Sequence, residues 1–158
     1  MFNLDGRVAL VTGAGQNVGA GIARLLAHQG AAIAVNDLRP DRATHTVERI
    51  TADGGRAVAV GFDVTDHEQV TRGVAQAELA LGPVDILVNN AAAAMYGDVA
   101  DLSLKRRRLL FELNVHAPFD LAQAAIPAMR AAGQGWIVNM SSASARSWAG
   151  PPCDLGSQ

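Results

Sequence analysis

The chain has 158 residues with a formal net charge of −2; 49% of its residues are hydrophobic and 18% are charged. This composition is ordinary for one globular domain and excludes a disordered chain, and so small a charge would not attract nucleic acid or an anionic membrane. No apolar stretch is long enough to span a bilayer, and the N-terminus shows no secretory signal pattern. The lone Cys153 fits a reducing compartment. The sequence therefore predicts one cytoplasmic domain over residues 1–158, with no nucleic-acid or membrane partner.

Apolar runs alternate regularly with helical patterns along the chain. The runs predict strands at residues 7–11, 31–36, 56–62, 84–88 and 136–140. Helical spacing predicts helices at residues 18–29, 41–52 and about 65–81, and a long helical region at 103–132 in which Pro118 marks a joint or kink. Thr65 or Asp66 is expected to cap the third helix. Five strands separated by helices predict an α/β fold with a doubly wound parallel sheet.

A glycine-rich turn joins the first strand to the first helix. Gly13, Gly15 and Gly19 lie in the stretch TGAGQNVG, with the spacing GxGxxxG in place of the commoner GxGxxG. Glycines let the backbone approach a pyrophosphate, and the helix N-terminus provides unpaired N–H groups. No Gly-Lys-Ser/Thr sequence follows, which argues against an ATPase or GTPase. The turn therefore predicts a phosphate cradle for a dinucleotide.

Asp37 ends the second predicted strand, where a carboxylate accepts both hydroxyls of an adenosine ribose. It would repel the additional phosphate of NADP, so NAD is the predicted cofactor and NADP is less favoured. Arg39 is a nearby cation that opposes this preference without overturning it. The alternative, in which Asp37 only begins a turn before Pro40, stays open.

Further motifs follow in a fixed order: FDVTD at 62–66, VNNAA at 88–92, LNVHAPF at 113–119 and IVNMSS at 137–142. With the glycine-rich turn and Asp37, they resemble the short, single-domain branch of the short-chain dehydrogenase/reductase family over essentially the whole chain. The resemblance implies a Rossmann-like fold and an oxidoreductase that transfers a hydride between the nicotinamide and an alcohol or carbonyl substrate. A methyltransferase would share the first loop and the acidic strand end, but it has no role for the motifs at 88–92 and 137–142.

The resemblance also implies which positions bind the cofactor. The pyrophosphate turn would comprise Gly13, Gly15, Gln16, Asn17, Val18 and Gly19. Asp37 would hold the adenosine ribose, while the Asp63 carboxylate and the Val64 backbone N–H would contact the adenine. Asn90 and Ala91 would line the adenine ribose side beneath the fourth strand.

Two residues would belong to the catalytic apparatus. Asn114 resembles the family's helix-kink asparagine, which orders a water in the proton relay. Ser142 resembles the serine that hydrogen-bonds the substrate oxygen; a serine that only caps the strand end is the alternative. Two positions depart from the family pattern: Asn17 and Ala92 stand where the family usually has glycine. Asparagine tolerates left-handed backbone better than other non-glycine residues, so we expect the turn to survive.

The family's general acid/base is a tyrosine with a lysine four residues later, and neither residue type occurs after Ser142. The chain's only tyrosine, Tyr96, and only lysine, Lys105, cannot reproduce a pairing over one helical turn. Either the chain is the nucleotide-binding part of a longer enzyme and is inactive alone, or it is a degenerate NAD-binding module. The first is favoured because Asp37, Asn114 and Ser142 are intact.

The helical region at 103–132 also predicts self-association. It carries apolar residues on more than one face, including Leu109, Leu110, Phe111 and Leu113, which is more than one sheet face can cover. The resemblance implies pairing through this region. We therefore expect a homo-oligomer, and the sequence leaves the substrate undefined.

Overall fold

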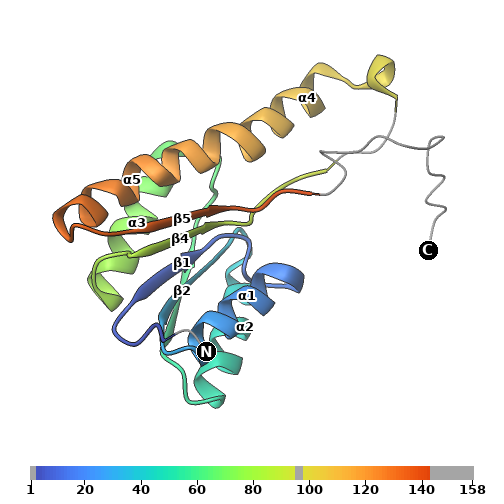
Figure 1. The fold of residues 1–158 in the computed structure, drawn as a ribbon. Helices are drawn as coiled ribbons and strands as arrows, with labels where there is room; N and C mark the ends of the chain where they lie inside the picture. Colours follow the sequence, from blue (N-terminus) through green and yellow to red (C-terminus); the bar gives the residue numbers. More distant parts are fainter. Residues whose placement is uncertain (1–2, 95–97, 143–158) are drawn as a thin grey trace.

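The computed structural model describes residues 3–94 and 98–142. Five parallel strands form one sheet in the order β3-β2-β1-β4-β5 (Figure 1). Their bounds are β1 (Val8–Val11), β2 (Ala32–Asp37), β3 (Ala57–Gly61), β4 (Ile86–Asn89) and β5 (Trp136–Asn139). This confirms the predicted doubly wound parallel sheet. The chain reverses its direction of travel across the sheet between β1 and β4, which makes their carboxyl ends the topological switch point.

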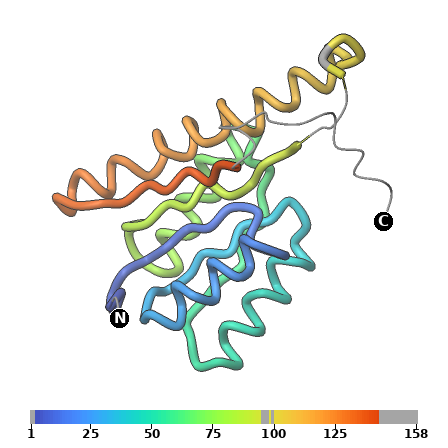
Figure 2. The backbone as a smooth tube through the Cα atoms, turned by 45° about the vertical axis from the view of Figure 1, so that its right-hand side comes forward, coloured from blue at the N-terminus to red at the C-terminus, as the bar shows by residue number. Residues whose placement is uncertain are grey.

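Helices cover the sheet on both faces. They are α1 (Asn17–His28), α2 (Pro40–Ala52), α3 (His67–Leu81), α4 (Leu104–Phe111) and α5 (Ala117–Ala131), with a 3₁₀ turn η1 (Val99–Asp101) and a π-helical segment η2 (Glu112–His116). One face lies under α1 and α2, and the other lies under α3 and α5 (Figures 1 and 2). Alternate strand residues enter the two hydrophobic clusters, as pleating requires: Val11 and Ile33 on the α1–α2 side, Leu10 and Ala34 on the other.

Chain turns fall close to their predicted places. Gly30, after α1, has a φ of +100°, a left-handed conformation that ends the helix at little cost. Asp66, and not Thr65, is the N-cap of α3, because its Oδ1 accepts a hydrogen bond from the Gln69 backbone N–H at 3.0 Å. That bond to the charged form lowers the pKa of the Asp66 carboxyl.

The predicted helical region at 103–132, with its joint near Pro118, is confirmed. The structure divides it into α4, η2 and α5, and the 3₁₀ turn η1 before it was not expected. The joint falls at η2, just before Pro118, which has no backbone N–H and lies in the first turn of α5. A π-helical segment widens the helix by one residue per turn, and such segments often occur at functional sites. In both views α4 continues the line of α5 away from the sheet (Figures 1 and 2).

The edge strand β5 differs from the other strands because all four of its residues are exposed. It is paired in parallel with β4, from Ile86–Trp136 to Asn89–Asn139. Arg7 holds its start: the guanidinium lies 5.3 Å from the Trp136 ring centre and donates to Asp85 at 3.1 Å. Within the described residues, no helix is long and apolar enough to cross a membrane.

Candidate functional site

A groove of about 360 Å³ lies at the carboxyl ends of the strands, beside the switch point between β1 and β4. Every position predicted to bind a cofactor lines it except Gly15, namely Gly13, Gln16, Asn17, Val18, Gly19, Asp37, Asp63, Val64, Asn90 and Ala91. Five further residues complete the lining and were not predicted as site residues: Asn36, Leu38, Phe62, Ala92 and Leu113. The tertiary structure therefore brings together residues from five separate segments of the chain into one concave surface.

Thr12, at the end of β1, joins the glycine-rich turn to the end of β4. Its Oγ1 accepts hydrogen bonds from the backbone N–H groups of Asn90 and Ala91, each at 3.0 Å, and donates to the Val88 carbonyl at 3.3 Å. Asn90 returns the connection, since its Nδ2 donates to the Thr12 and Gly13 carbonyls. This role of Thr12 was not predicted from the sequence, in which a threonine directly after the first strand is the available signal.

The glycine-rich turn needs small residues where it approaches its neighbours. Gly13 has a φ of +59°, and a Cβ there would lie 3.0 Å from the Ala91 Cα. A Cβ at Gly19 would collide with the Gly13 carbonyl oxygen and the Asn90 side chain. Asn17 has a φ of +49°, the only positive value at a non-glycine among residues 3–94 and 98–142, so the left-handed backbone expected for this position is confirmed.

The start of α1 has the features of an anion site. Its N-cap residue, Gln16, makes no side-chain capping bond, so the first N–H groups of the helix lack the usual N-cap acceptor. No acidic residue lies in the first turn. Unpaired N–H groups and the positive end of the helix dipole favour a phosphate at this place.

Asp37 lies at the end of β2 and is only 7% exposed. Its Oδ2 accepts a hydrogen bond from the Gly15 N–H at 3.1 Å, and its Oδ1 accepts one from the Arg39 N–H at 2.9 Å. A carboxylate has about four acceptor positions, so two remain for other donors. A Cβ at Gly15 would lie 2.6 Å from Asp37 Oδ2 and 2.5 Å from the Arg42 Cβ. Gly15 thus lies behind Asp37 and lets the carboxylate approach the turn, instead of lining the groove itself.

Asp63 and Val64 follow β3 at the opposite end of the groove from the switch point. Asp63 Oδ1 accepts from the Thr65 N–H at 2.9 Å and from the Thr65 hydroxyl at 2.8 Å, which closes a tight turn and leaves Oδ2 as an acceptor. The Asp63 N–H donates to Gln69 at 3.2 Å. In the described part of the chain, no group of three or more His, Cys, Asp or Glu side chains could hold a metal ion.

Asn114 lies in η2 and connects it to the segment after β4. Its Oδ1 accepts from the Ala93 N–H at 3.0 Å, and its Nδ2 donates to the Ala93 carbonyl at 2.8 Å. The Asn114 side chain therefore holds the Ala93 backbone in place. Any water that Asn114 orders must bond to groups of Asn114 that these two hydrogen bonds leave available. Ser142 follows β5 and is exposed. Tyr96 and Cys153 lie outside the described residues.

Comparison with known proteins gives the class. Residues 7–150 match the family model described as short chain dehydrogenase. The 7alpha-hydroxysteroid dehydrogenase of Escherichia coli (strain K12) is 38% identical over 150 residues, which cover 92% of this chain and 58% of that protein. The chain therefore belongs to the short-chain dehydrogenase family.

Two solved structures show the same architecture. The 7 alpha-hydroxysteroid dehydrogenase complexed with NADH and 7-oxo glycochenodeoxycholic acid is similar with a TM-score of 0.89 at 37% identity, over 93% of this chain and 57% of that one. Gluconate 5-dehydrogenase from Burkholderia cenocepacia J2315, in complex with NADP and tartrate, is similar with a TM-score of 0.87 at 36% identity. The match covers 96% of this chain and 59% of that one. The chain spans 57–59% of the length of these relatives.

Proposed function

We propose that the chain is the nucleotide-binding part of an NAD-dependent oxidoreductase that transfers a hydride between the cofactor and an alcohol or carbonyl substrate. The observation that carries this is the buried Asp37 carboxylate, which lines the groove at the end of β2 with two acceptor positions remaining. Two ribose hydroxyls can use those positions.

The residues of the groove fit a nicotinamide dinucleotide. The uncapped start of α1, with Gly13 and Gly19, would hold the pyrophosphate. Asp37 would hold the adenosine ribose, and Asp63 and Val64 would contact the adenine. When bound, the nicotinamide supplies the hydride acceptor or donor, and the protein contributes binding and orientation.

A preference for NAD over NADP is the sharpest part of the proposal, because the relatives divide: one was solved with NADH and another with NADP. A phosphate placed against the Asp37 carboxylate is a like-charge contact, which costs several kcal/mol when water is excluded and less when it is screened. Calorimetric titration of the full-length protein is expected to show NAD binding at least about tenfold tighter than NADP.

Asp37→Ala should relax this discrimination without unfolding the domain, and Asp5→Ala, a carboxylate change outside the groove, serves as the matched control. NADP binding equal to or tighter than NAD binding in the unaltered protein would falsify the preference.

For catalysis, Ser142 would hydrogen-bond the substrate oxygen and Asn114 would hold a water, and neither gives up a proton readily near neutral pH. A positioned acid/base contributes roughly 10²–10⁴ in rate, and the 158 residues lack the family's tyrosine and lysine pair. We therefore expect these residues alone to show no turnover, and a form extended by a tyrosine with a lysine four residues later to be active. Nicotinamide absorbance, followed with secondary alcohols and ketones, measures both.

A binding module without turnover is the second candidate, favoured by the same absence of the pair in this sequence. An extended form that binds NAD tightly and turns over none of the substrates would support it. Turnover by the 158 residues that survives Tyr96→Phe and is lost in Ser142→Ala would contradict the binding module and the proposed mechanism, because another acid would then be at work.

We further propose that the full-length protein is a homo-oligomer that pairs through α4 and its neighbours. Large apolar side chains are exposed along α4, η2 and the start of α5, namely Leu104, Leu109, Phe111, Val115 and Phe119. Exposed apolar surface of this extent favours burial against a partner. Sedimentation that shows only monomer at micromolar concentration would contradict this proposal.

A further inference from the structure

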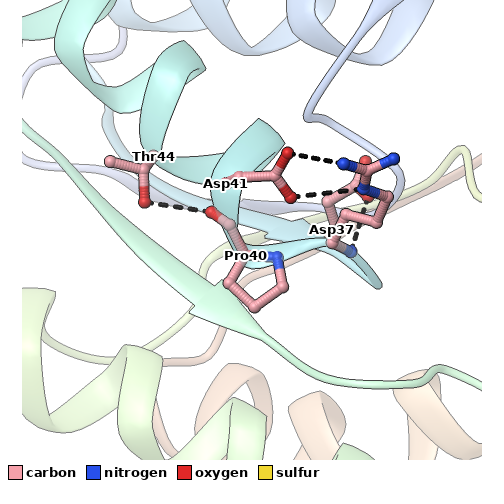
Figure 3. Close-up of polar contacts among 5 residues, drawn as sticks. Asp37, Pro40, Asp41 and Thr44 are labelled. Carbon is pink, nitrogen blue, oxygen red and sulfur yellow. Dashed lines mark hydrogen bonds and ion pairs between the residues drawn. The ribbon is translucent and has the colours of Figure 1, made fainter.

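Two oppositely charged residues that follow β2 pair with each other. Arg39 Nε donates to Asp41 Oδ1 at 3.2 Å, and Arg39 Nη2 donates to Asp41 Oδ2 at 2.8 Å. Figure 3 shows both Asp41 oxygens joined by dashed lines to the guanidinium, close to Asp37. This two-bond geometry is the one in which a guanidinium also recognises a phosphate. The pairing raises the pKa of Arg39 and lowers that of Asp41, so both are charged at neutral pH.

Arg39 is placed where it would meet the additional phosphate of NADP. Its backbone N–H donates to Asp37 Oδ1 at 2.9 Å, so its Cα lies next to the carboxylate proposed to hold the ribose hydroxyls. A phosphate on that ribose would lie within the length of one arginine side chain. Arg39 taken alone would thus favour NADP and oppose Asp37.

Asp41 changes this balance in two ways. The Asp41 carboxylate occupies the Nε–Nη2 edge of the Arg39 guanidinium, and its negative charge cancels the positive charge of Arg39. Asp37, Arg39 and Asp41 together sum to −1 (−1 + 1 − 1), whereas Asp37 and Arg39 alone sum to zero. Arg42, whose Cβ lies against Gly15, adds the same charge in both cases.

We propose that Asp41 is a specificity-determining residue, which strengthens the discrimination against NADP by engaging Arg39. The inference rests on the proposed function, since it concerns which dinucleotide enters the groove beside Asp37. It assigns the choice of cofactor to a pair of residues and not to Asp37 alone.

A purely structural role for Asp41 makes a different prediction. Asp41 lies in the first turn of α2, where a carboxylate interacts favourably with the helix dipole. The N-cap residue of this helix, Arg39, makes no side-chain capping bond. Near the start of the same helix, the Thr44 hydroxyl donates to the Pro40 carbonyl at 3.0 Å, and this hydrogen bond does not involve Asp41 (Figure 3). If Asp41 only stabilises the helix, its replacement will lower the melting temperature and leave the ratio of cofactor affinities unchanged.

The test is a double-mutant cycle in the full-length protein, with Kd for NAD⁺ and NADP⁺ measured by calorimetry. Because the pair is exposed, at 59% for Arg39 and 64% for Asp41, the expected effect is modest. Asp41→Asn should tighten NADP⁺ binding about fivefold, the scale of one exposed charge pair, and change NAD⁺ binding less than about twofold. Arg39→Ala lowers the local charge to −2 and should by itself weaken NADP⁺ binding relative to NAD⁺; combined with Asp41→Asn, it should abolish the gain.

Asp53→Asn is the matched control, because it removes the same charge from a comparably exposed pair with Arg24 outside the groove. It should leave the ratio unchanged. Asp41→Ser, which retains a hydrogen-bonding side chain in the first turn, replaces Asp41→Asn if that variant does not fold.

Three results overturn the inference: an unchanged ratio in a folded Asp41 variant, a gain that persists without Arg39, or an equal gain in Asp53→Asn. Failure of the proposed function gives a different result, because the unaltered protein would then bind neither dinucleotide. NAD⁺ binding with an unchanged ratio in the Asp41 variant contradicts only the role of Asp41.

Discussion

Two regions of the molecule differ in how completely they are packed. In the first region, every residue of β1, β2 and β4 is buried, and α1, α2 and α3 each contribute buried residues to one of two hydrophobic clusters. In the second region, every residue of β5 is exposed, and neither α4 nor η2 contains a buried residue. The proposed nucleotide groove lies mainly in the buried region, whereas Asn114 and Ser142 lie in the exposed region. The residues proposed for cofactor binding and those proposed for catalysis therefore lie in parts of the fold with unequal packing.

Core truncations should give the largest contrast between these regions. Leu10 is fully buried in β1 and Ile137 in β5 is 38% exposed. We expect Leu10→Ala to lower the free energy of unfolding by about 2–5 kcal/mol, because it leaves a cavity, and Ile137→Ala to lower it by less than about 1 kcal/mol. Urea denaturation measures both. An equal loss in the two variants would mean that β5 is buried by contacts that form in solution.

Alanine substitution of two glycines, one in each region, compares how readily the neighbouring side chains make room for an added methyl group. A Cβ at Gly73 in α3 would collide with the ring of Phe62, a buried residue, and one at Gly135 before β5 would collide with the Met129 side chain. Gly73→Ala should lower the free energy of unfolding by about 1–3 kcal/mol, since the buried Phe62 ring must shift to make room for the added methyl group. Gly135→Ala should cost less because methionine changes rotamer readily. Gly21→Ala, with no neighbour within 4 Å, is the control and should be neutral or stabilising.

The Asn114–Ala93 contact links the two regions and should have an intermediate effect. Asn114→Ala removes two hydrogen bonds to the Ala93 backbone, each contributing about 0.5–1.5 kcal/mol, with the lower end expected for an exposed site. The Ala93 amide should exchange its hydrogen faster in Asn114→Ala than in the unaltered protein. Glu112→Ala, also in η2, is the control. An unchanged Ala93 exchange rate in Asn114→Ala would show that the backbone holds its position without this side chain.

The N-caps of α3 and α4 should give the smallest effects. Asp66 caps a helix with five buried residues, and Ser103 caps α4, which has none. Ser103→Ala should therefore change stability by no more than about 0.5 kcal/mol, and Asp66→Ala should lower the melting temperature further.

The Asp66 effect should also depend on pH. The folded pKa of Asp66 lies below its ordinary value of 3.8, so its charge stabilises the fold fully above that value and ceases to do so as pH falls through the folded pKa. The difference in melting temperature between the unaltered protein and Asp66→Asn should shrink over that acidic range. A difference that stays constant there would assign the effect to hydrogen bonding alone.

Much of the fold was predictable because its signals are local. Strand and helix periodicity, the glycine-rich turn and the motif order identified the parallel sheet and the family before any contact was known. The left-handed backbone at Asn17 was expected because the family usually has glycine there and asparagine tolerates that conformation. Asp37 could be singled out because the end of a parallel strand has a fixed place at the edge of a sheet.

The rest depended on residues that are distant in the chain. The contact of Gly15 with Asp37, the bonds of Thr12 to the end of β4 and the clamp of Asn114 on Ala93 join segments whose spacing carries no periodic signal. The joint in residues 103–132 was predicted at Pro118, but its π-helical form at η2, beside the segment after β4, was not. The sequence alone determined which elements form and which loop has the glycine spacing of a phosphate cradle, because local backbone preference and side-chain pattern decide these. Only the tertiary structure decided that Gly15 supports Asp37, that Thr12 joins the end of β4 and that Asn114 binds the Ala93 backbone, because each depends on which groups packing brings within contact distance.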